Sequence, residues 1–523
     1  MPTEVDEDHQ TANLWHRVAA RSGAARLHIL AILVCIVWAW QVGHDSNWDL
    51  FNYHLYNGLA LLDGSFNDDI APGGLQTYLN PVVDIPLAVA VNLVGVRGGV
   101  IAASALTQYL CYLAVWRLTK VLTVEPNAYR TRVVLTLFAV VGAGAMSLAF
   151  TTFGDWIVAA ALCEGLRLIL RARSIQESGG QPRWDYIVGG AIIGAAVGVK
   201  LTVAPFGIAL LIALPLLAGW GDVLRTAAGM LGGFLASAGP WMIYLQVRFG
   251  SPLFPFLNNI FQADSAPFES FDDARFGATG IIDALAAPLR LAKGSSEYGE
   301  FLFREWRFIA VAIAALVSLL LRGRSSQLVA RRPITYMAAV LLISYSIWVL
   351  QFGYYRYFLF GEILASLLFV LIVFELVADS RRASAYCLAI AAGGLVFQHA
   401  PDWGRNVPLV SPPLTQVTSE IDGGYTVAIL AIAPVGYLKA SMAGDPRILY
   451  VYGFVAGAFV VDGAIGTELI DALDSAMETD SLYAITELGA AGEIPYVDGA
   501  VLVDCVEIPD RDRLLQFCGV KRP

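Results

Sequence analysis

The stretch Asp45-Ser-Asn-Trp-Asp49-Leu-Phe-Asn-Tyr-His-Leu-Tyr56 decides how this chain is interpreted. It places two carboxylates and several aromatic and amide groups directly after the first long apolar segment of the sequence. In a membrane protein, such a position is where aqueous chemistry meets lipid. The rest of the sequence tests whether the chain is a membrane protein and which other polar groups share this side of the membrane.

A helical periodicity begins inside this stretch. Apolar residues recur at steps of three or four, at Trp48, Phe51, Leu55, Leu59 and Leu62. The polar residues of an adjoining face are Asp49, Asn52, Tyr53 and Tyr56. This spacing predicts an amphipathic helix on the membrane surface with its polar face toward a cavity. Asp45, Ser46 or Asn47 can cap its start, and a cap is the simplest role for Asp45. A first-turn acid favoured by the helix dipole is the structural alternative for Asp49.

The composition is that of an integral membrane protein. Of 523 residues, 57% are hydrophobic and only 15% are charged, and the mean hydropathy is +0.61. A membrane-spanning helix needs about 20 apolar residues. Eleven predicted spans lie near 27–43, 99–119, 131–152, 156–172, 186–199, 202–219, 226–247, 306–321, 334–350, 357–378 and 384–398.

The distribution of Lys and Arg predicts the orientation. With the N-terminal tail (1–26) in the cytoplasm, the cytoplasmic segments before residue 399 hold 18 Lys and Arg, and the opposite side holds nine over much longer loops. Eleven spans then place the C-terminus outside. The sequence before residue 27 lacks a small-residue cleavage motif, so the first helix is expected to remain as an anchor.

The composition changes after the last predicted span. Residues 399–523 carry 17 acidic and seven basic side chains, which accounts for the whole net charge of −10. Short β-branched and aromatic runs at 425–430, 447–452 and 496–503, with a helical stretch at 467–477, predict a small extracytoplasmic α/β domain. The transmembrane module is then 27–398, with long external loops at 44–98 and 248–305.

The cysteines and glycines exclude some classes of site. Four cysteines fall within predicted spans, whereas Cys505 and Cys518 lie in the external domain and form either a disulfide or two free thiols. No His/Cys cluster has zinc-ligand spacing, and no Gly-rich loop follows a strand. A soluble nucleotide-sugar donor is therefore not supported, and no nucleic-acid partner is expected.

Two acids are predicted to face the same external compartment. Asp155 lies between two apolar spans, at an external end, as does Asp49. Ionisable groups at membrane depth are costly and usually functional. One carboxylate could accept the proton of a hydroxyl while the other holds an acceptor or a cation. An N-cap is the structural alternative for Asp155. His44 and His54 are better explained as structural hydrogen-bonding groups.

Cationic side chains at the same level could hold a phosphate. Arg356, flanked by Tyr355, lies at the outer end of the ninth predicted span, where the positive-inside rule does not explain it. Lys200 is a second candidate, and Arg248 is a weaker one that could instead stabilise a helix C-terminus. A divalent cation is possible. The loop 248–305, with Asp272, Asp273 and Arg275 near its middle, predicts surface helices and a lid.

The order of these parts resembles the GT-C glycosyltransferases. Asp49-x3-Tyr53, with Gly58 and Gly64 beyond it, is similar to the acid-x3-Tyr segment after the first helix in their arabinosyl- and mannosyltransferase branches. Segment 81–94 followed by Gly95-Val-Arg97 is similar to their juxtamembrane helix and connection. Thr151-Thr-Phe-Gly-Asp155 is similar to their second external loop, and Gly198-Val-Lys200 to a turn at the outer end of the fifth span. The resemblance covers roughly 27–380 and is closest to bacterial family 87 or uncharacterised members.

The resemblance implies a polytopic helical fold and a polyprenyl-phosphate sugar donor used outside the cytoplasm. Asp49 would be the general base and Asp155 a second catalytic acid, while Arg356, Lys200, Tyr53, Tyr355, Asp45 and Arg248 would bind substrate. The acceptor would be a glycan, a lipid or a protein. The chain lacks the Asp-Glu pair of protein O-mannosyltransferases, so the resemblance does not itself imply a protein acceptor. The expected location is the inner (plasma) membrane, among its lipids.

Two other functions remain open from the sequence. A lipid-linked glycan transporter or flippase could line its path with the same charges, but it would need polar groups through the membrane depth and often shows inverted repeats, which are not visible here. An O-antigen type polymerase or ligase would share the donor chemistry but use a lipid diphosphate glycan.

Overall fold

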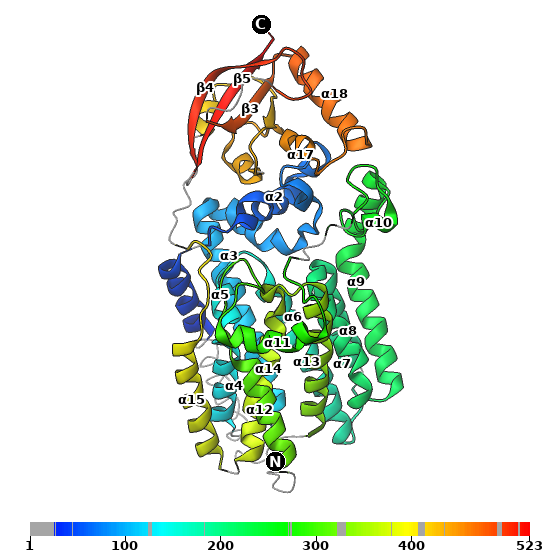
Figure 1. Ribbon diagram of the computed structural model, residues 1–523, viewed down its shortest axis with the longest axis vertical. Coiled ribbons are helices and arrows are strands. Elements are labelled where there is room, and N and C mark those ends of the chain that lie inside the picture. Colours follow the sequence, from blue (N-terminus) through cyan, green and yellow to red (C-terminus); the bar gives the residue numbers. More distant parts are fainter. Residues whose placement is uncertain are drawn as a thin grey trace, which may run out of the picture.

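The computed structural model describes residues 26–522 apart from 27, 44, 124–127, 183, 270, 272–274, 322–330, 378, 406–413, 434, 489–493 and 511–512. A bundle of helices forms the lower half of the molecule, and a sheet domain forms the upper end (Figure 1). Between them lies the loop 44–98, which is named the external loop after its predicted location. The bundle comprises the helix His28–Val42 and α3 (Ile85–Leu122), α4 (Tyr129–Val140), α5 (Ala143–Leu148), α6 (Asp155–Glu177), α7 (Asp185–Val199), α8 (Ala204–Ile212), α9 (Trp220–Phe249), α12 (Arg307–Leu320), α13 (Arg331–Gln351), α14 (Leu359–Leu376) and α15 (Ser380–Phe397).

Each of the eleven apolar segments coincides with a described helix or pair of helices. Among the described residues, four helices are long and apolar enough to cross a membrane: 81–122, 220–249, 332–351 and 355–376. Shorter apolar helices lie at 28–42, 185–199, 201–216 and 307–320. The predicted polytopic helical fold is thus confirmed, whereas the count of eleven spans stays a prediction.

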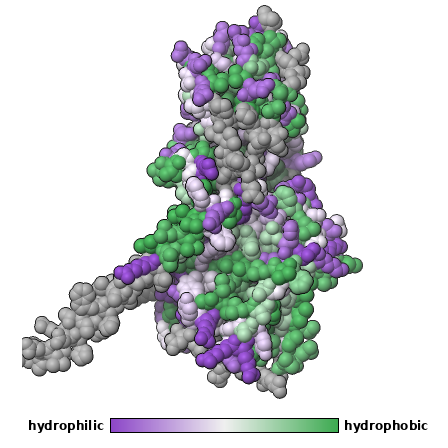
Figure 2. Space-filling model, turned by 90° about the vertical axis from the view of Figure 1, so that its left-hand side faces the viewer, coloured by the Kyte–Doolittle hydropathy of each residue, from purple (hydrophilic) through white to green (hydrophobic). Residues whose placement is uncertain are grey.

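Helix α14 is the centre of the bundle. In its most apolar window 89% of the residues are buried, against 22–39% in the other three long helices. Those outer helices expose large apolar side chains such as Leu231, Ile243 and Val247, and Figure 2 shows apolar surface over much of the lower half. In a chain this apolar, such a surface faces lipid.

Helices α7 and α9 pack through glycines. A Cβ added to Gly190 or Gly194 would lie 2.2 and 1.9 Å from the carbonyl oxygens of Thr226 and Met230 on α9. The reverse holds for Gly229 and Gly233, whose added Cβ would meet α7 carbonyls at 2.1 and 1.9 Å. Small residues let membrane helices approach closely, and here they are required for the observed contact.

The predicted Gly-x-Arg connection is a kink inside α3. Val94 and Gly95 have non-helical backbone angles, and Gly95 has φ +77°, a left-handed conformation that favours glycine. The kink separates a short juxtamembrane helix from the long span, as the sequence predicts.

The external loop contains the helix predicted from the opening stretch. Residues 48–63 are helical, with η1 (Leu50–His54) a π-turn and α2 (Leu55–Asp63) an α-helix. It packs between the bundle and the sheet domain (Figure 1), so Tyr53 and Tyr56 are buried as well as Phe51 and Leu55. Because side chains of both predicted faces are buried, the expectation of an amphipathic helix lying on the membrane surface is corrected.

Further elements of the two long loops are η2 (Ser65–Asn67), η3 (Gly74–Tyr78), η4 (Pro81–Asp84), α10 (Asn258–Phe261) and α11 (Ile281–Lys293). Three short turns within the bundle are η5 (Leu201–Val203), η6 (Leu214–Leu216) and η7 (Tyr355–Phe358).

The C-terminal domain is built on a five-stranded mixed sheet of order β2-β1-β3-β5-β4. Its elements are α16 (Leu414–Thr418), β1 (Thr426–Ile429), η8 (Gly436–Ser441), β2 (Arg447–Leu449), α17 (Val451–Val455), α18 (Ala464–Glu478), β3 (Leu482–Glu487), β4 (Val501–Asp510) and β5 (Arg513–Lys521). Strand β1 is parallel to β2 and β3, and β5 is antiparallel to β3 and β4. A disulfide joins Cys505 and Cys518 across the β4–β5 hairpin, which settles the alternative that the sequence leaves open.

The sheet domain is fixed to the external loop. Apolar side chains of the loop and of the sheet form one continuous core. Asp69 is fully buried and accepts hydrogen bonds from Lys439 Nζ (2.7 Å), from the backbone N–H of Ile448 (2.7 Å) and from the hydroxyl of Tyr56 (2.8 Å). The domain boundaries at 26/27 and 398/399 stay predictions.

Candidate functional site

The candidate site begins where the helix of the external loop begins. Asn47 caps this helix by accepting a hydrogen bond from the backbone N–H of Leu50 (2.8 Å). In the π-turn that follows, the N–H of Leu55 bonds to the carbonyl of Leu50, five residues back. This turn brings residues five apart, such as Asp49 and His54, closer to a common face than an α-turn would. Single π-turns occur frequently at functional sites.

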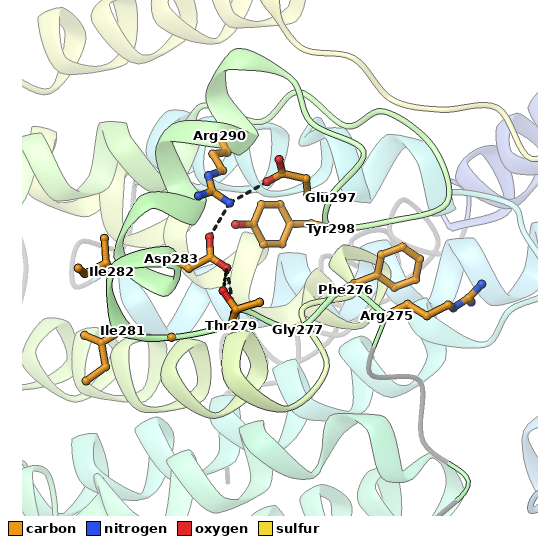
Figure 3. Close-up of a pocket in the computed structure, with 11 residues that line it drawn as sticks. Arg275, Phe276, Gly277, Thr279, Ile281, Ile282, Asp283, Arg290, Glu297 and Tyr298 are labelled. Atoms are coloured by element: carbon orange, nitrogen blue, oxygen red, sulfur yellow. Dashed lines mark hydrogen bonds and ion pairs between the residues drawn. The ribbon is translucent and has the colours of Figure 1, made fainter.

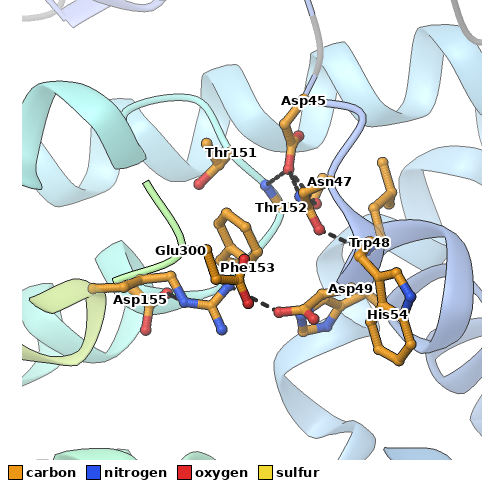
Figure 4. Close-up of polar contacts among 12 residues, drawn as sticks. Asp45, Asn47, Trp48, Asp49, His54, Thr151, Thr152, Phe153, Asp155 and Glu300 are labelled. Carbon is orange, nitrogen blue, oxygen red and sulfur yellow. Dashed lines mark hydrogen bonds and ion pairs between the residues drawn. The ribbon is translucent and has the colours of Figure 1, made fainter. Parts of the chain in front are cut away.

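Four residues predicted from the sequence form one chain of ion pairs. Arg356 Nη1 donates to Asp49 Oδ2 at 2.8 Å, and its Nε lies 3.6 Å from Asp155 Oδ2. Lys200 Nζ donates to Asp155 Oδ1 at 2.7 Å and to the carbonyl of Phe153 at 2.9 Å. Figure 4 shows Asp49 and Asp155 on opposite sides of this cluster. Two carboxylates and two cations thus balance one another.

The cluster is buried, but one edge is accessible. The side chains of Asp155 and Arg356 are 3% and 7% exposed, whereas those of Asp49 and Lys200 are 18% and 16% exposed. Arg356 Nε and Asp155 Oδ2 have no hydrogen-bond partner among the described residues. A buried ion pair that lacks some of its hydrogen bonds is costly. An incoming ligand with phosphate or hydroxyl groups would relieve this cost.

Aromatic rings surround the guanidinium of Arg356. Its Cζ lies 3.9 Å from the ring centroid of Phe153, 5.1 Å from that of Tyr354, 5.3 Å from that of Tyr357 and 6.0 Å from that of Trp403. These contacts are cation–π interactions, which strengthen when the cation is desolvated. The rings hold the guanidinium in one place and leave its hydrogen-bonding edge for carboxylates or a ligand.

The electrostatic environment keeps Asp49 ionised. Burial raises the pKa of this carboxyl, but the charge and hydrogen bond of Arg356, together with the charge of Lys200, hold it below its ordinary value. Tyr53 lies nearby, and burial followed by the negative charge of Asp49 raises the pKa of its hydroxyl well above the ordinary value. Tyr53 therefore stays protonated and can act only as a neutral hydrogen-bonding group.

Three predicted site residues lie outside the cluster. Asp45 is fully buried and accepts hydrogen bonds from the backbone N–H and hydroxyl of Thr152 (3.0 and 2.8 Å), so it joins the two external segments instead of capping a helix. Tyr355 points away from Arg356 and donates to Glu362. Arg248 pairs with Glu468 of α18 at 2.7 Å. The three side chains thus have partners other than the cluster, and their role in substrate binding stays a prediction.

A pocket lies at the start of α11. Its volume is about 840 Å³, and it is lined by residues of 275–283 with Arg290, Glu297 and Tyr298 (Figure 3). Phe276 in its wall stacks on Tyr354 at 4.8 Å between centroids. Ile281 and Ile282 at its rim are 77% and 85% exposed. The predicted lid loop therefore forms a partly apolar recess whose wall contacts Tyr354, while Asp272 and Asp273, like His44, lie outside the described residues.

Sequence reasoning missed a second ion pair beside the cluster. His54 Nδ1 lies 2.6 Å from Asp84 Oδ1, and both side chains are almost fully buried. The residues are 30 positions apart, and nothing in their local sequence marks them as partners. The π-turn is the feature that orients His54, and the sequence carries no signal for it. Within the described residues, no group of three or more His, Cys, Asp and Glu could hold a metal ion, and a divalent cation stays a prediction.

The bundle, the external loop and the sheet domain together define a helical membrane protein with a small mixed-sheet domain. No family model and no curated protein matches the chain. Solved structures of ArnT from Cupriavidus metallidurans do match it. The apo form has a TM-score of 0.56 at 13% identity, covering 96% of this chain and 98% of that one. The form bound to undecaprenyl phosphate has a TM-score of 0.55 at 12% identity, covering 95% and 98%.

An oligosaccharyltransferase from Archaeoglobus fulgidus in the apo form is more distantly similar, with a TM-score of 0.42, 12% identity and coverage of 88% of this chain and 69% of that one. The ArnT structures are only 12% and 13% identical in sequence to this chain, so the likeness shows a shared fold. The fold that the sequence resemblance implies is thereby confirmed.

Proposed function

We propose that this protein is a membrane glycosyltransferase that moves a sugar from a polyprenyl phosphate to a hydroxyl of an extracytoplasmic acceptor. The observation that carries the proposal is the cluster of Asp49, Asp155, Lys200 and Arg356. It is nearly closed to solvent, and two of its atoms, Arg356 Nε and Asp155 Oδ2, accept or donate no hydrogen bond among the described residues. Such a cluster binds an anion and holds a base within one site.

The cations suit the donor phosphate. A guanidinium binds phosphate oxygens through paired hydrogen bonds, and an ammonium adds a compact charge. As the bond between the anomeric carbon and the phosphate oxygen breaks, the electron pair goes to the phosphate. Arg356 and Lys200 would stabilise the negative charge that develops there.

Asp49 is the proposed general base. It is the more exposed of the two carboxylates, and its low pKa keeps it ionised. It would accept the proton of the acceptor hydroxyl as that oxygen bonds to the anomeric carbon. Asp155, held by Lys200, would keep the two cations in place. The partly apolar recess beside Tyr354 suits the first isoprenyl units of the donor, in keeping with the lipid phosphate bound by ArnT of the same fold.

The proposal is tested with purified full-length protein in liposomes. The probes are undecaprenyl-phosphate pentoses and hexoses carrying a radiolabel in the sugar, offered with glycan, lipid and peptide acceptors. Transfer of label to an acceptor, or slow transfer to water, supports the proposal. Movement of intact labelled donor between leaflets without cleavage would contradict it and indicate a flippase. A parallel assay with a chelator decides whether a divalent cation takes part.

A further inference from the structure

The pair formed by His54 and Asp84 has the geometry of a proton acceptor. Nδ1 of His54 lies 2.6 Å from Asp84 Oδ1, and the side chains are 4% and 3% exposed. A carboxylate accepts hydrogen bonds, so Nδ1 carries the hydrogen and Nε2 presents a lone pair. Among the described residues, Nε2 has no partner. An imidazole buried only for packing would leave this atom unsatisfied, at a cost of about 1–3 kcal/mol.

This pair lies beside the proposed base. The π-turn η1 brings His54 toward the face that carries Asp49, and Figure 4 shows the two side chains near each other. Once His54 has received a proton, its positive charge and the carboxylate of Asp49 attract each other. The titratable and charged groups around His54 are Asp84 from η4, Asp49 and Tyr53 from its own helix, with Lys200 and Arg356 from the bundle.

Asp49 needs such a partner. Because Arg356 holds its pKa low, a proton taken from an acceptor hydroxyl is bound weakly on this carboxylate. A neutral imidazole is a stronger base than such a carboxylate, so proton transfer to it is favourable. The negative charge of Asp84 then stabilises the resulting imidazolium, and Asp49 returns to its ionised state for the next turnover.

We propose that His54, oriented by Asp84, receives the proton that Asp49 takes from the acceptor, so that the three residues form a relay leading away from the reacting carbon. This inference rests on the proposed function. One oxygen–carbon bond forms at the sugar, the bond from that carbon to phosphate breaks with its electrons going to phosphate, and the proton ends on His54 Nε2. His54 and Asp84 act through Asp49 and are positioning and relay residues.

The test measures kcat and KM against pH for the full-length protein with the undecaprenyl-phosphate sugar that the wild type uses best. The wild-type kcat should fall on the acid side of its pH profile, because an imidazole that is already protonated cannot accept a proton. The His54→Gln variant cannot accept a proton. It should lose roughly tenfold to a hundredfold in kcat, toward the lower end of proton-transfer effects, and the acid limb should disappear while the donor KM stays nearly constant.

Two further variants make the result decisive. Asp84→Asn removes the charge that stabilises the imidazolium, so kcat should fall and the acid limb should move to lower pH. His399→Gln, an exposed histidine outside the site, should match the wild type. Binding of undecaprenyl phosphate, measured as a rise in melting temperature, reports whether each variant is folded. If His54→Gln does not fold, Asp84→Asn decides alone.

Different experimental results would overturn the relay and the proposed function. If the wild type transfers sugar and the folded His54→Gln variant keeps both its kcat and its acid limb, the relay is wrong and the glycosyltransferase proposal stands. Equal loss of donor binding and kcat in the variants would mean a structural role and would also overturn the relay. If the wild type cleaves none of the probes, both proposals fall together.

Discussion

At the scale of single residues, Arg356 is the point at which the site is assembled. It contacts carboxylates from the external loop and from α6, and aromatic rings from three segments of the chain. A side chain with so many fixed partners is pre-organised, so little entropy remains to be lost when a phosphate binds.

We predict that Asp49→Asn lowers turnover by roughly a hundredfold or more, because the amide keeps the shape of the carboxylate but cannot accept a proton. The donor KM should change little. Asp68→Asn, an exposed acid of the same loop, is the matched control. Initial rates with the labelled donor measure the effect. Full activity of Asp49→Asn would transfer the role of base to Asp155.

The low pKa of Asp49 has a consequence for stability. Its folded-state pKa is depressed, so the stabilising contribution is present above the unfolded pKa of about 4 and is lost as pH falls through the folded value. We therefore expect the melting temperature of the wild type to decline below about pH 4, and that of Asp49→Asn to decline less. Parallel curves for the two proteins would contradict this assignment.

Arg356→Ala should weaken donor binding, because it removes a phosphate contact and leaves Asp49 without its cation. Arg356→Lys keeps the charge without the paired geometry and should recover only part of the affinity. Arg248→Ala is the control, since Arg248 contacts Glu468 and not the cluster. Binding of undecaprenyl phosphate at several concentrations measures the three affinities, and equal affinity of Arg356→Ala and the wild type would exclude Arg356 from the phosphate site.

At the scale of elements, long apolar runs made the bundle predictable, since every such run coincides with described helices. Part of the site was predictable because charged residues at the ends of apolar spans are unusual. Four such residues, Asp49, Asp155, Lys200 and Arg356, lie together in the structure. What sequence could not supply was side-chain direction. Tyr355 and Tyr357 are equally close in sequence to Arg356, yet η7 turns the first toward Glu362 and the second toward the guanidinium.

The sequence also could not predict which residues that are far apart along the chain would pair. Asp84 pairs with His54 within the external loop, and Arg248 of α9 pairs with Glu468 of α18 in the sheet domain. Both pairs depend on how segments distant in the sequence pack. Strands β3 and β5 were missed, although Leu482–Glu487 and Arg513–Lys521 are six and nine residues long. Their strand conformation depends on neighbours in the sheet more than on local propensity.

The glycine contact between α7 and α9 gives a prediction at this scale. Gly233→Ala places a Cβ 1.9 Å from the Ala191 carbonyl oxygen, so the helices must separate, at a cost typical of overpacking, about 1–3 kcal/mol. Gly232→Ala, next to it on α9, meets nothing within 4 Å and should be neutral. Thermal unfolding in detergent compares them. Equal melting temperatures would show that the helices do not depend on this contact.

At the scale of the whole molecule, the cluster lies where the bundle meets the external loop, beneath the sheet domain. The side of the membrane on which the sheet domain lies is therefore the side on which the proposed reaction takes place. If the N-terminus is cytoplasmic, a reporter that is active only outside the cytoplasm should work when fused to the C-terminus and fail when inserted at residue 180, in the turn between α6 and α7. The opposite pattern would place the site on the cytoplasmic side.

The disulfide of the β4–β5 hairpin belongs to the same compartment. Protein from its native membrane should give joined Cys505 and Cys518 peptides in non-reducing mass mapping, and free thiols would contradict an oxidising location. Replacing both cysteines with serine should destabilise the sheet domain by about 3 kcal/mol, the value usual for a loop of this size. The ion cluster is remote from the hairpin, so activity per folded molecule should persist.

The π-turn at Leu50–His54 links the site to the length of its helix. A π-turn holds one residue more than the α-turn it replaces. In a regular α-helix of unchanged length, Asp49 and the residue five positions later would point in different directions. Loss of a single codon between positions 50 and 53 would restore a regular helix and leave the carboxylate and the imidazole four positions apart, again on one face. Proteins with this fold can therefore keep such a pair in either of two forms, five positions apart in a π-turn or four positions apart in a regular helix.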